Sequence, residues 1–195
     1  MAKAQRIYWD ACAWIAFIAE EKAVPLKDGG TENRYGMCLN ILEAARKGKY
    51  EIVTSAFTLA EVCQIPEVVA SPIDNLPAFF EKSYILIVPV DLAIGRRAQA
   101  MQASGLVRLK PADTVHLASA QRAKVVELHT FDDRILALDN TIIGGDGNLL
   151  KICRPTQGAP IGPLFEGSYN DPKAEPANDP EKRPDQPLQG SGAAA

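Results

Sequence analysis

The sequence predicts a three-layer α/β/α sandwich with a central parallel sheet of about five strands. Short apolar runs alternate with segments of helical periodicity up to residue 153, which is the pattern of a parallel sheet covered by helices on both faces. Hydrophobic residues make up 47% of the 195-residue chain, enough to fill one core. We therefore expect a single α/β domain.

The expected strands are the short apolar runs, which in chain order cover residues 6–9, 51–54, 85–88, 125–129 and 150–152. Helices are expected between them, at residues 11–20, 33–47, 56–64, 74–82, 91–103, 112–123 and 132–138. Two of these helices begin with local signals. Ser55 suits an N-cap, and Pro111 suits the first turn of a helix.

The segment from residue 154 to residue 195 differs in composition from the rest of the chain. It is rich in Pro, Gly, Asn, Asp and Glu and has almost no β-branched residues. Such a segment cannot bury enough apolar surface to offset the entropy lost on ordering. We predict a folded domain over residues 1–153 and a Pro-rich, disordered tail over residues 154–195.

The cysteines and the N-terminal segment indicate the cellular compartment in which the protein is expected. Cysteines at positions 12, 38, 63 and 153 include no close pair suited to a zinc knuckle or a redox motif. The apolar stretch near the N-terminus is interrupted by Asp10 and ended by Glu20 and Glu21, so it fits neither a signal peptide nor a membrane span. We expect a cytoplasmic protein with reduced cysteines and no membrane association.

Two acidic residues follow strands that are expected to end at the same edge of the sheet. Asp10 comes directly after the first strand, and Asp132 follows the fourth. Ligands of open parallel α/β sheets bind at the carboxyl ends of the strands. Each residue also has an alternative role. Asp10 can cap the next helix, and Thr130 with Asp133 fits a capping box, so either Asp132 or Asp133 can point inward.

Two further acidic residues lie in segments that are otherwise apolar. Glu61 sits about two turns into the expected helix 56–64, where an ionised carboxylate needs a partner, a metal or the solvent face of the helix. Asp113 begins the helix 112–123 and shares a face with His116, so we expect it to look inward. For His116 itself, we expect a packed and hydrogen-bonded side chain and no direct part in catalysis.

Gathered at one edge, these carboxylates would repel one another unless a cation neutralises them. Mg²⁺ and Mn²⁺ are hard ions that take oxygen ligands. The net charge of −3 argues against binding nucleic acid mainly through a broad basic surface. A bound metal would let an acidic site accept an anionic phosphodiester.

Four motifs contain these acidic residues: Tyr8–Cys12, Thr54–Val62, Pro111–Ala120 and Leu128–Asp132. Together they resemble the motifs of PIN-domain proteins, and most closely those of VapC-type toxins. The order and spacing of the four motifs are more specific than any one alone. The resemblance implies a parallel α/β/α sandwich, Mg²⁺- or Mn²⁺-dependent endoribonuclease activity on RNA, a cognate antitoxin and a homodimer.

The resemblance also implies the roles of single residues. Asp10, Glu61 and Asp113 match the three best-defined acidic positions of the family, and Asp132 matches the more variable fourth. All four are expected to be catalytic and to contribute to the metal site. One departure is Cys12, at a position where the family usually has Ser, Thr or Asn. A thiol is a weak hydrogen-bond donor, so another residue is expected to support the metal site, and Thr130 is a candidate.

The expected reaction is hydrolysis of an RNA phosphodiester, with Glu61 acting as a ligand through water or as a base. The main alternative is a degenerate PIN module that binds RNA or a protein without cleavage.

Two other classes of protein with acidic sites at a sheet edge do not fit the sequence. Haloacid-dehalogenase phosphatases need a second Asp two residues after the first, where this chain has Cys12. Receiver domains of response regulators need two neighbouring acidic residues near the start of the chain and a Lys at the end of a strand late in the chain. Neither feature is evident in this sequence.

Overall fold

The computed structural model describes residues 4–63, 79–105 and 109–156. Its centre is a five-stranded sheet with the order β5-β4-β1-β6-β7, and every neighbouring pair of strands is parallel. The strands are β1 (Gln5–Trp9), β4 (Tyr50–Ser55), β5 (Ile85–Val88), β6 (Glu127–His129) and β7 (Lys151–Cys153). The predicted parallel sheet is therefore confirmed.

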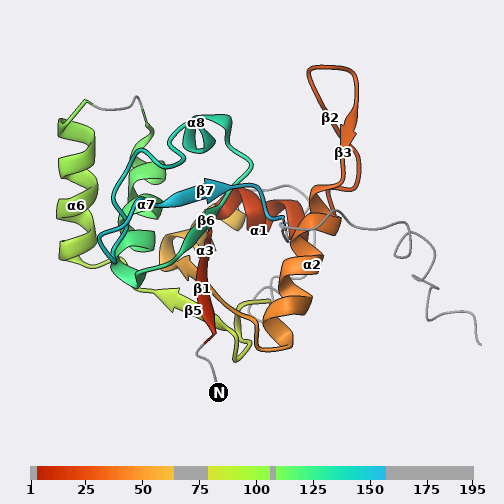
Figure 1. Cartoon of the computed structure of the whole chain (residues 1–195), viewed down its shortest axis with the longest axis horizontal. Coiled ribbons are helices and arrows are strands. Elements are labelled where there is room, and N and C mark those ends of the chain that lie inside the picture. The colour runs from red at the N-terminus through yellow and green to blue at the C-terminus, as the bar shows by residue number, and fades with distance from the viewer. Residues whose placement is uncertain (1–3, 64–78, 106–108, 157–195) are drawn as a thin grey trace, which may run out of the picture. The chain divides into compact units, whose positions relative to one another are not determined.

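Helices cover both faces of this sheet. They are α1 (Ala11–Ile18), α2 (Arg34–Arg46), α3 (Ala56–Val62), α6 (Leu92–Ala103), α7 (Pro111–Ala123) and the short α8 (Asp133–Leu136). Figure 1 shows α6 and α7 on one side of the strands and α2 on the other. The three-layer arrangement agrees with the predicted fold class.

The alternation of side chains along β1 divides the core into two halves. Ile7 and Trp9 point to one face, where they pack with α1 and α2. Tyr8 points to the other face and joins the cluster formed by α6, α7 and α8. All three side chains are fully buried. Strand β1 therefore lies at the centre of the molecule, and the residue that follows it emerges between the two helical layers.

A short hairpin, β2 (Val24–Pro25) paired with β3 (Thr31–Glu32), was not among the expected elements. It projects beyond the rest of the domain in Figure 1. Its turn depends on Gly29, whose φ of +89° is in the region that favours glycine. The Asp-Gly-Gly sequence at residues 28–30 is the signal that could have predicted this turn.

Two predictions fall largely outside the described residues. The helix expected at residues 74–82 overlaps them only from residue 79, and the tail expected at residues 154–195 only up to residue 156. Both stay predictions. Within the described part of the chain, every helix is too short or too polar to cross a lipid bilayer.

Candidate active site

Asp10 lies at the junction of β1 and α1 and is almost completely buried, with 1% of its surface exposed. One carboxylate oxygen, Oδ1, accepts the backbone N–H of Ala13 at 3.1 Å, so Asp10 is the N-cap of α1. The other oxygen, Oδ2, accepts a hydrogen bond from the Thr130 hydroxyl. The capping role and an inward-facing carboxylate are therefore realised together. Thr130 contacts Asp10, and its support of a metal site stays a prediction.

Burial raises the pKa of Asp10 to about 6. The electrostatic interaction with His116 and the hydrogen bonds from Thr130 and Ala13 oppose this rise, whereas the negative charge of Glu61 adds to it. A carboxylate in this setting is stabilised by any cation that binds next to it.

Asp132 and its neighbour Asp133 point to different surroundings. Asp132 caps α8 and pairs with the Arg134 guanidinium, whose Nη2 lies 2.5 Å from Oδ2. This hydrogen bond lowers the pKa of Asp132. The Asp133 side chain is 65% exposed and lies 3.3 Å from the Nζ of Lys27. Nη2 of Arg134 also lies 4.0 Å from Oδ2 of Asp113. The Arg134 guanidinium therefore lies beside both Asp113 and Asp132.

Asp113 and Glu61 are both held by hydrogen bonds. Asp113 is 8% exposed, and its Oδ2 accepts the backbone N–H of Lys110 at 2.9 Å at the start of α7. Oε2 of Glu61 lies 2.7 Å from Nε2 of His116, and the Glu61 side chain is 22% exposed. Glu61 thus has a specific partner and does not simply lie on the solvent face of α3.

Direct contacts link three of the predicted acids. The Thr130 hydroxyl joins Asp10 to the backbone N–H of Asp132, and Nη2 of Arg134 lies 2.5 Å from Asp132 and 4.0 Å from Asp113. Cys12, in the first turn of α1, also senses the charge of all four. Burial raises the pKa of the Cys12 thiol, and the negative charges of Asp10, Asp132, Glu61 and Asp113 raise it further, in that order. One side chain therefore lies in the electrostatic field of all four carboxylates. They reach it from four separate segments of the chain, at the carboxyl edge of the sheet.

The sequence model of the PIN-domain family matches residues 7–140. This match spans more than half of the chain and contains all four acidic residues. The chain belongs to the PIN-domain family. No curated protein matches its sequence. Among solved structures, it is similar to the Mycobacterium tuberculosis VapC20, described as a sarcin-ricin loop cleaving toxin. The identity is 16%, the TM-score is 0.47, and the match covers 65% of this chain and 90% of that one.

The carboxylates of this PIN domain are spaced more widely than a set of direct metal ligands. Among the described residues, the one group of His, Cys, Asp or Glu whose ligand atoms all lie within 4.8 Å of one another is Glu127, His129 and Cys153. Mg²⁺ typically keeps several waters and uses only one or two carboxylates directly. The guanidinium between Asp113 and Asp132 also shows that the site accommodates positive charge. The donor set therefore fits a hydrated divalent ion.

The compact group of Glu127, His129 and Cys153 has a different chemistry. The indole N–H of Trp9 donates to Nδ1 of His129 at 3.2 Å, so Nδ1 holds the lone pair of the neutral ring and Nε2 carries the proton. Nε2 in turn lies 3.1 Å from Oε2 of Glu127, and Lys151 pairs with the other oxygen at 2.8 Å. These hydrogen bonds lower the pKa of Glu127 to about 2. Because Nε2 has no free lone pair, we assign this group to joining β1, β6 and β7.

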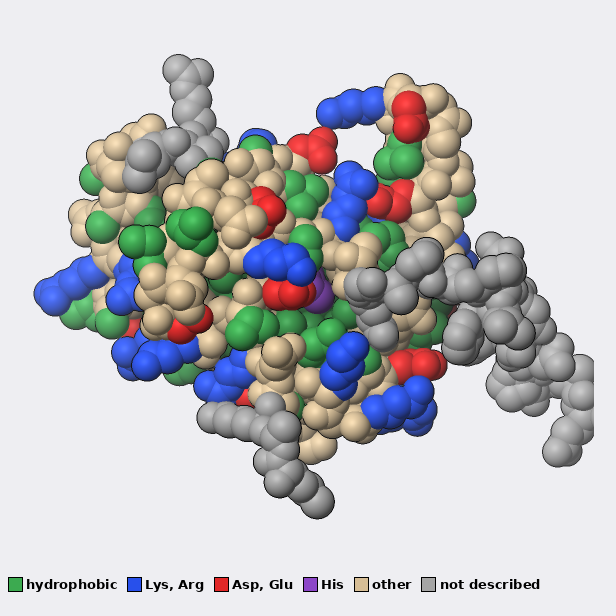
Figure 2. Space-filling model, viewed as in Figure 1, with side chains coloured by type: hydrophobic (Ala, Val, Ile, Leu, Met, Phe, Trp, Pro, Cys, Tyr) green, Lys and Arg blue, Asp and Glu red, His purple; other side chains and the backbone are tan. Residues whose placement is uncertain are grey.

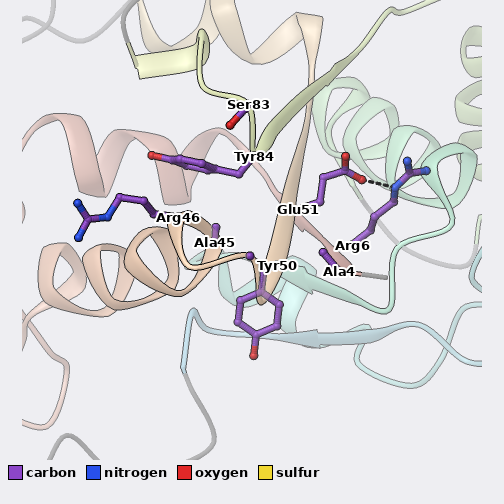
Figure 3. Close-up of a pocket in the computed structure, with 9 residues that line it drawn as sticks. Ala4, Arg6, Ala45, Arg46, Tyr50, Glu51, Ser83 and Tyr84 are labelled. Carbon is purple, nitrogen blue, oxygen red and sulfur yellow. Dashed lines mark hydrogen bonds and ion pairs between the residues drawn. The ribbon is translucent and has the colours of Figure 1, made fainter. Parts of the chain in front are cut away.

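A surface pocket of about 350 Å³ lies at the opposite, amino edge of the sheet. Its lining includes Arg6 at the start of β1 and the neighbouring pair Tyr50 and Glu51 of β4. Figure 3 shows the Arg6 guanidinium directed at Glu51, and the two form a 2.5 Å ion pair. None of the four predicted acids lines this pocket. The candidate active site is therefore separate from it.

Sequence reasoning pointed to Thr130 but missed other partners of the acids and of His116. The local signal that could have indicated Arg134 is its position two residues after the N-cap Asp132, to whose Oδ1 it donates from Nε. The hydroxyl of Tyr8 lies 2.9 Å from Nδ1 of His116, and no local pattern indicates a contact between residues 108 positions apart. His116 is packed and hydrogen-bonded, as expected, with 3% of its surface exposed.

Proposed function

We propose that this protein is a metal-dependent endoribonuclease that hydrolyses RNA phosphodiester bonds at the site formed by Asp10, Glu61, Asp113 and Asp132. The contacts that Thr130 and Arg134 make with Asp10, Asp113 and Asp132 carry the proposal, because they join three of these carboxylates at one edge of the sheet. Membership of the PIN-domain family supports a nuclease role. Figure 2 shows acidic and basic side chains interspersed over the visible face. The net charge of −3 favours binding of phosphate at a cation site over binding by a broad basic surface.

The roles of the residues follow from their surroundings. Asp10, Asp113 and Asp132 would hold Mg²⁺ or Mn²⁺. When bound, such an ion polarises the phosphate and makes a water more acidic. Glu61 uses Oε2 to accept a hydrogen bond from His116, which leaves Oε1 to orient the attacking water and to take its proton. Thr130 holds Asp10 in place for the ion.

The motif resemblance to VapC-type toxins supports a finer assignment. We propose that the protein is the toxin of a toxin-antitoxin pair, acts as a cytoplasmic homodimer and is inhibited by a cognate antitoxin. The alternative is a PIN module that binds RNA or a protein without cleavage, and Cys12 in the acidic site is the observation that favours it. Expression of the chain with its neighbouring reading frames tests the partner, since a small antitoxin should copurify.

The activity is tested by incubating the full-length protein with a panel of structured RNAs and Mn²⁺. Wild-type protein should cleave RNA, and a chelator should stop cleavage. Glu61→Gln should slow cleavage by about a hundredfold or more, because general bases contribute at least this much. Glu43→Gln, which changes an exposed glutamate of α2, is the matched control and should cleave normally. Binding of RNA that stays intact across the panel would favour the non-cleaving module.

A further inference from the structure

A buried histidine connects the central strand to the carboxylate of Glu61. His116 lies on α7, with Nδ1 2.9 Å from the hydroxyl of Tyr8 and Nε2 2.7 Å from Oε2 of Glu61. Tyr8 is fully buried in β1, two residues before Asp10. The chain of contacts therefore joins β1, α7 and α3.

The direction of the hydrogen bonds follows from the donors and acceptors. An ionised carboxylate has no proton to donate, so Nε2 of His116 must donate to Glu61. The Tyr8 hydroxyl can donate to Nδ1 of the neutral ring. Both ring nitrogens are then engaged, and a flip of the ring would break both hydrogen bonds.

Two aromatic rings also restrain His116. The Tyr8 ring makes an edge contact with the imidazole at a centroid distance of 5.9 Å. The Phe57 ring of α3 lies 6.3 Å away. Glu61, by contrast, is 22% exposed at the side chain and has several rotatable bonds. The rigid imidazole is therefore able to limit the conformations of the more mobile carboxylate.

We propose that His116 is a positioning residue for Glu61. It holds Oε2, so that Oε1 faces the water that attacks the phosphodiester, and Tyr8 keeps the imidazole in the required orientation. This inference rests on the proposed ribonuclease function and adds two residues to it. Both residues are buried, so they act through Glu61 and not on the RNA itself.

A double-mutant cycle on RNA cleavage tests this coupling. His116→Leu should lower kcat by about tenfold to a hundredfold, the usual effect of losing such a supporting hydrogen bond, and leave KM within about twofold. His116→Gln retains an N–H donor and should recover most of the loss. In the Glu61→Gln background, His116→Leu should have no further effect on kcat, because the residue it positions is already inactive.

Tyr8→Phe provides a second variant that preserves the packing of the ring. It should lower kcat in the same direction as His116→Leu, by a smaller factor, when assayed below its melting temperature, which should fall because Nδ1 of His116 loses its donor. An equal loss of kcat from His116→Leu in both backgrounds would overturn the proposal. So would a His116→Gln protein no more active than His116→Leu.

A spectroscopic measurement separates failure of this inference from failure of the proposed function. The sequence has only two histidines, His116 and His129. In NMR spectra of the wild-type protein, the Nε2–H proton of His116 should exchange slowly with water, and Glu61→Leu should abolish this signal. Absence of the signal in wild type would overturn the inference alone. An intact signal in a protein that cleaves no RNA would overturn the proposed function, and with it the role of His116.

Discussion

The hydroxyl of Thr130 donates a hydrogen bond to Oδ2 of Asp10, although the two residues are 120 positions apart. The contact arises because β1 and β6 are parallel neighbours with Trp9 opposite His129, so the next residues of both strands emerge side by side. The Thr130 oxygen also accepts the backbone N–H of Asp132 at 3.0 Å. One hydroxyl thus connects two of the four acids and provides the polar support that Cys12 provides poorly.

Thr130→Val should weaken Mn²⁺ binding most at mildly acidic pH. The hydrogen bond from Thr130 lowers the pKa of Asp10, so its loss should raise that pKa further above about 6. We expect calorimetry to show about tenfold weaker binding near pH 6 and a smaller difference near pH 8, where Asp10 is ionised in both proteins. Thr130→Ser should behave like wild type. Equal affinities of wild type and Thr130→Val at both pH values would refute this role.

Asp10→Asn should stabilise the protein at pH 8 without metal. Burial raises the pKa of Asp10 from 3.8 to about 6, so the stability contributed by the protonated form is fully present below about pH 4 and is lost as the pH rises through about 6. Because one unit of pKa corresponds to about 1.4 kcal/mol, the gain is at most about 3 kcal/mol.

The measurement is the melting temperature as a function of pH. The advantage of Asp10→Asn should shrink as the pH falls through about 6. Asp91→Asn is the control, because Asp91 is an exposed N-cap of α6 and asparagine caps helices equally well. If Asp10→Asn melts below wild type at pH 8, the buried carboxylate is not a source of instability.

Arg134→Gln should tighten the binding of Mn²⁺. The guanidinium pairs with Asp132 and lies 4.0 Å from Asp113, so it competes with a divalent ion for the same oxygens. Arg134 is 45% exposed at its side chain, and exposed ion pairs contribute little, so we expect about a twofold to fivefold gain in affinity. Arg122→Gln, which alters an exposed arginine of α7, controls for the change in net charge. Weaker binding in Arg134→Gln would mean that Arg134 assists the site.

Gly145→Ala should destabilise the domain. A Cβ at this position would lie 1.7 Å from the backbone oxygen of Gln121, near the end of α7. Because neither backbone segment can yield easily, we expect a loss of about 1–3 kcal/mol in the free energy of unfolding by urea. Gly95→Ala in α6 meets no atom within 4 Å and should stabilise by about 0.5–1 kcal/mol. Equal stability of the two variants would show that the segment around residue 145 packs elsewhere.

The sheet could be predicted because its signals are local. The strand Ile85–Val88 has the bounds expected from its apolar run, and the others differ from expectation only at their ends. The place of Asp10 also followed from local rules, since a residue directly after a parallel strand must lie at the carboxyl edge. The hairpin β2–β3 was missed because its strands are only two residues each, too short to show alternation.

Several contacts of the acids could not be predicted, because they depend on how distant segments pack or on how side chains are oriented. The hydrogen bond between Glu61 and His116 joins residues 55 positions apart, and no spacing rule applies at that distance. The choice between Asp132 and Asp133 likewise depends on where α8 begins and on how Arg134 folds back. Periodicity places these residues on elements but does not orient their side chains.

Calorimetric titration of Mn²⁺ into the full-length protein tests the central claim most directly. Wild type should bind Mn²⁺ saturably, Asp10→Asn and Asp113→Asn should lose binding while remaining folded by circular dichroism, and Glu127→Gln should bind like wild type. Binding that survives in Asp113→Asn and disappears in Glu127→Gln would move the metal to the group of Glu127, His129 and Cys153. No binding by wild type would contradict the proposed metal site outright.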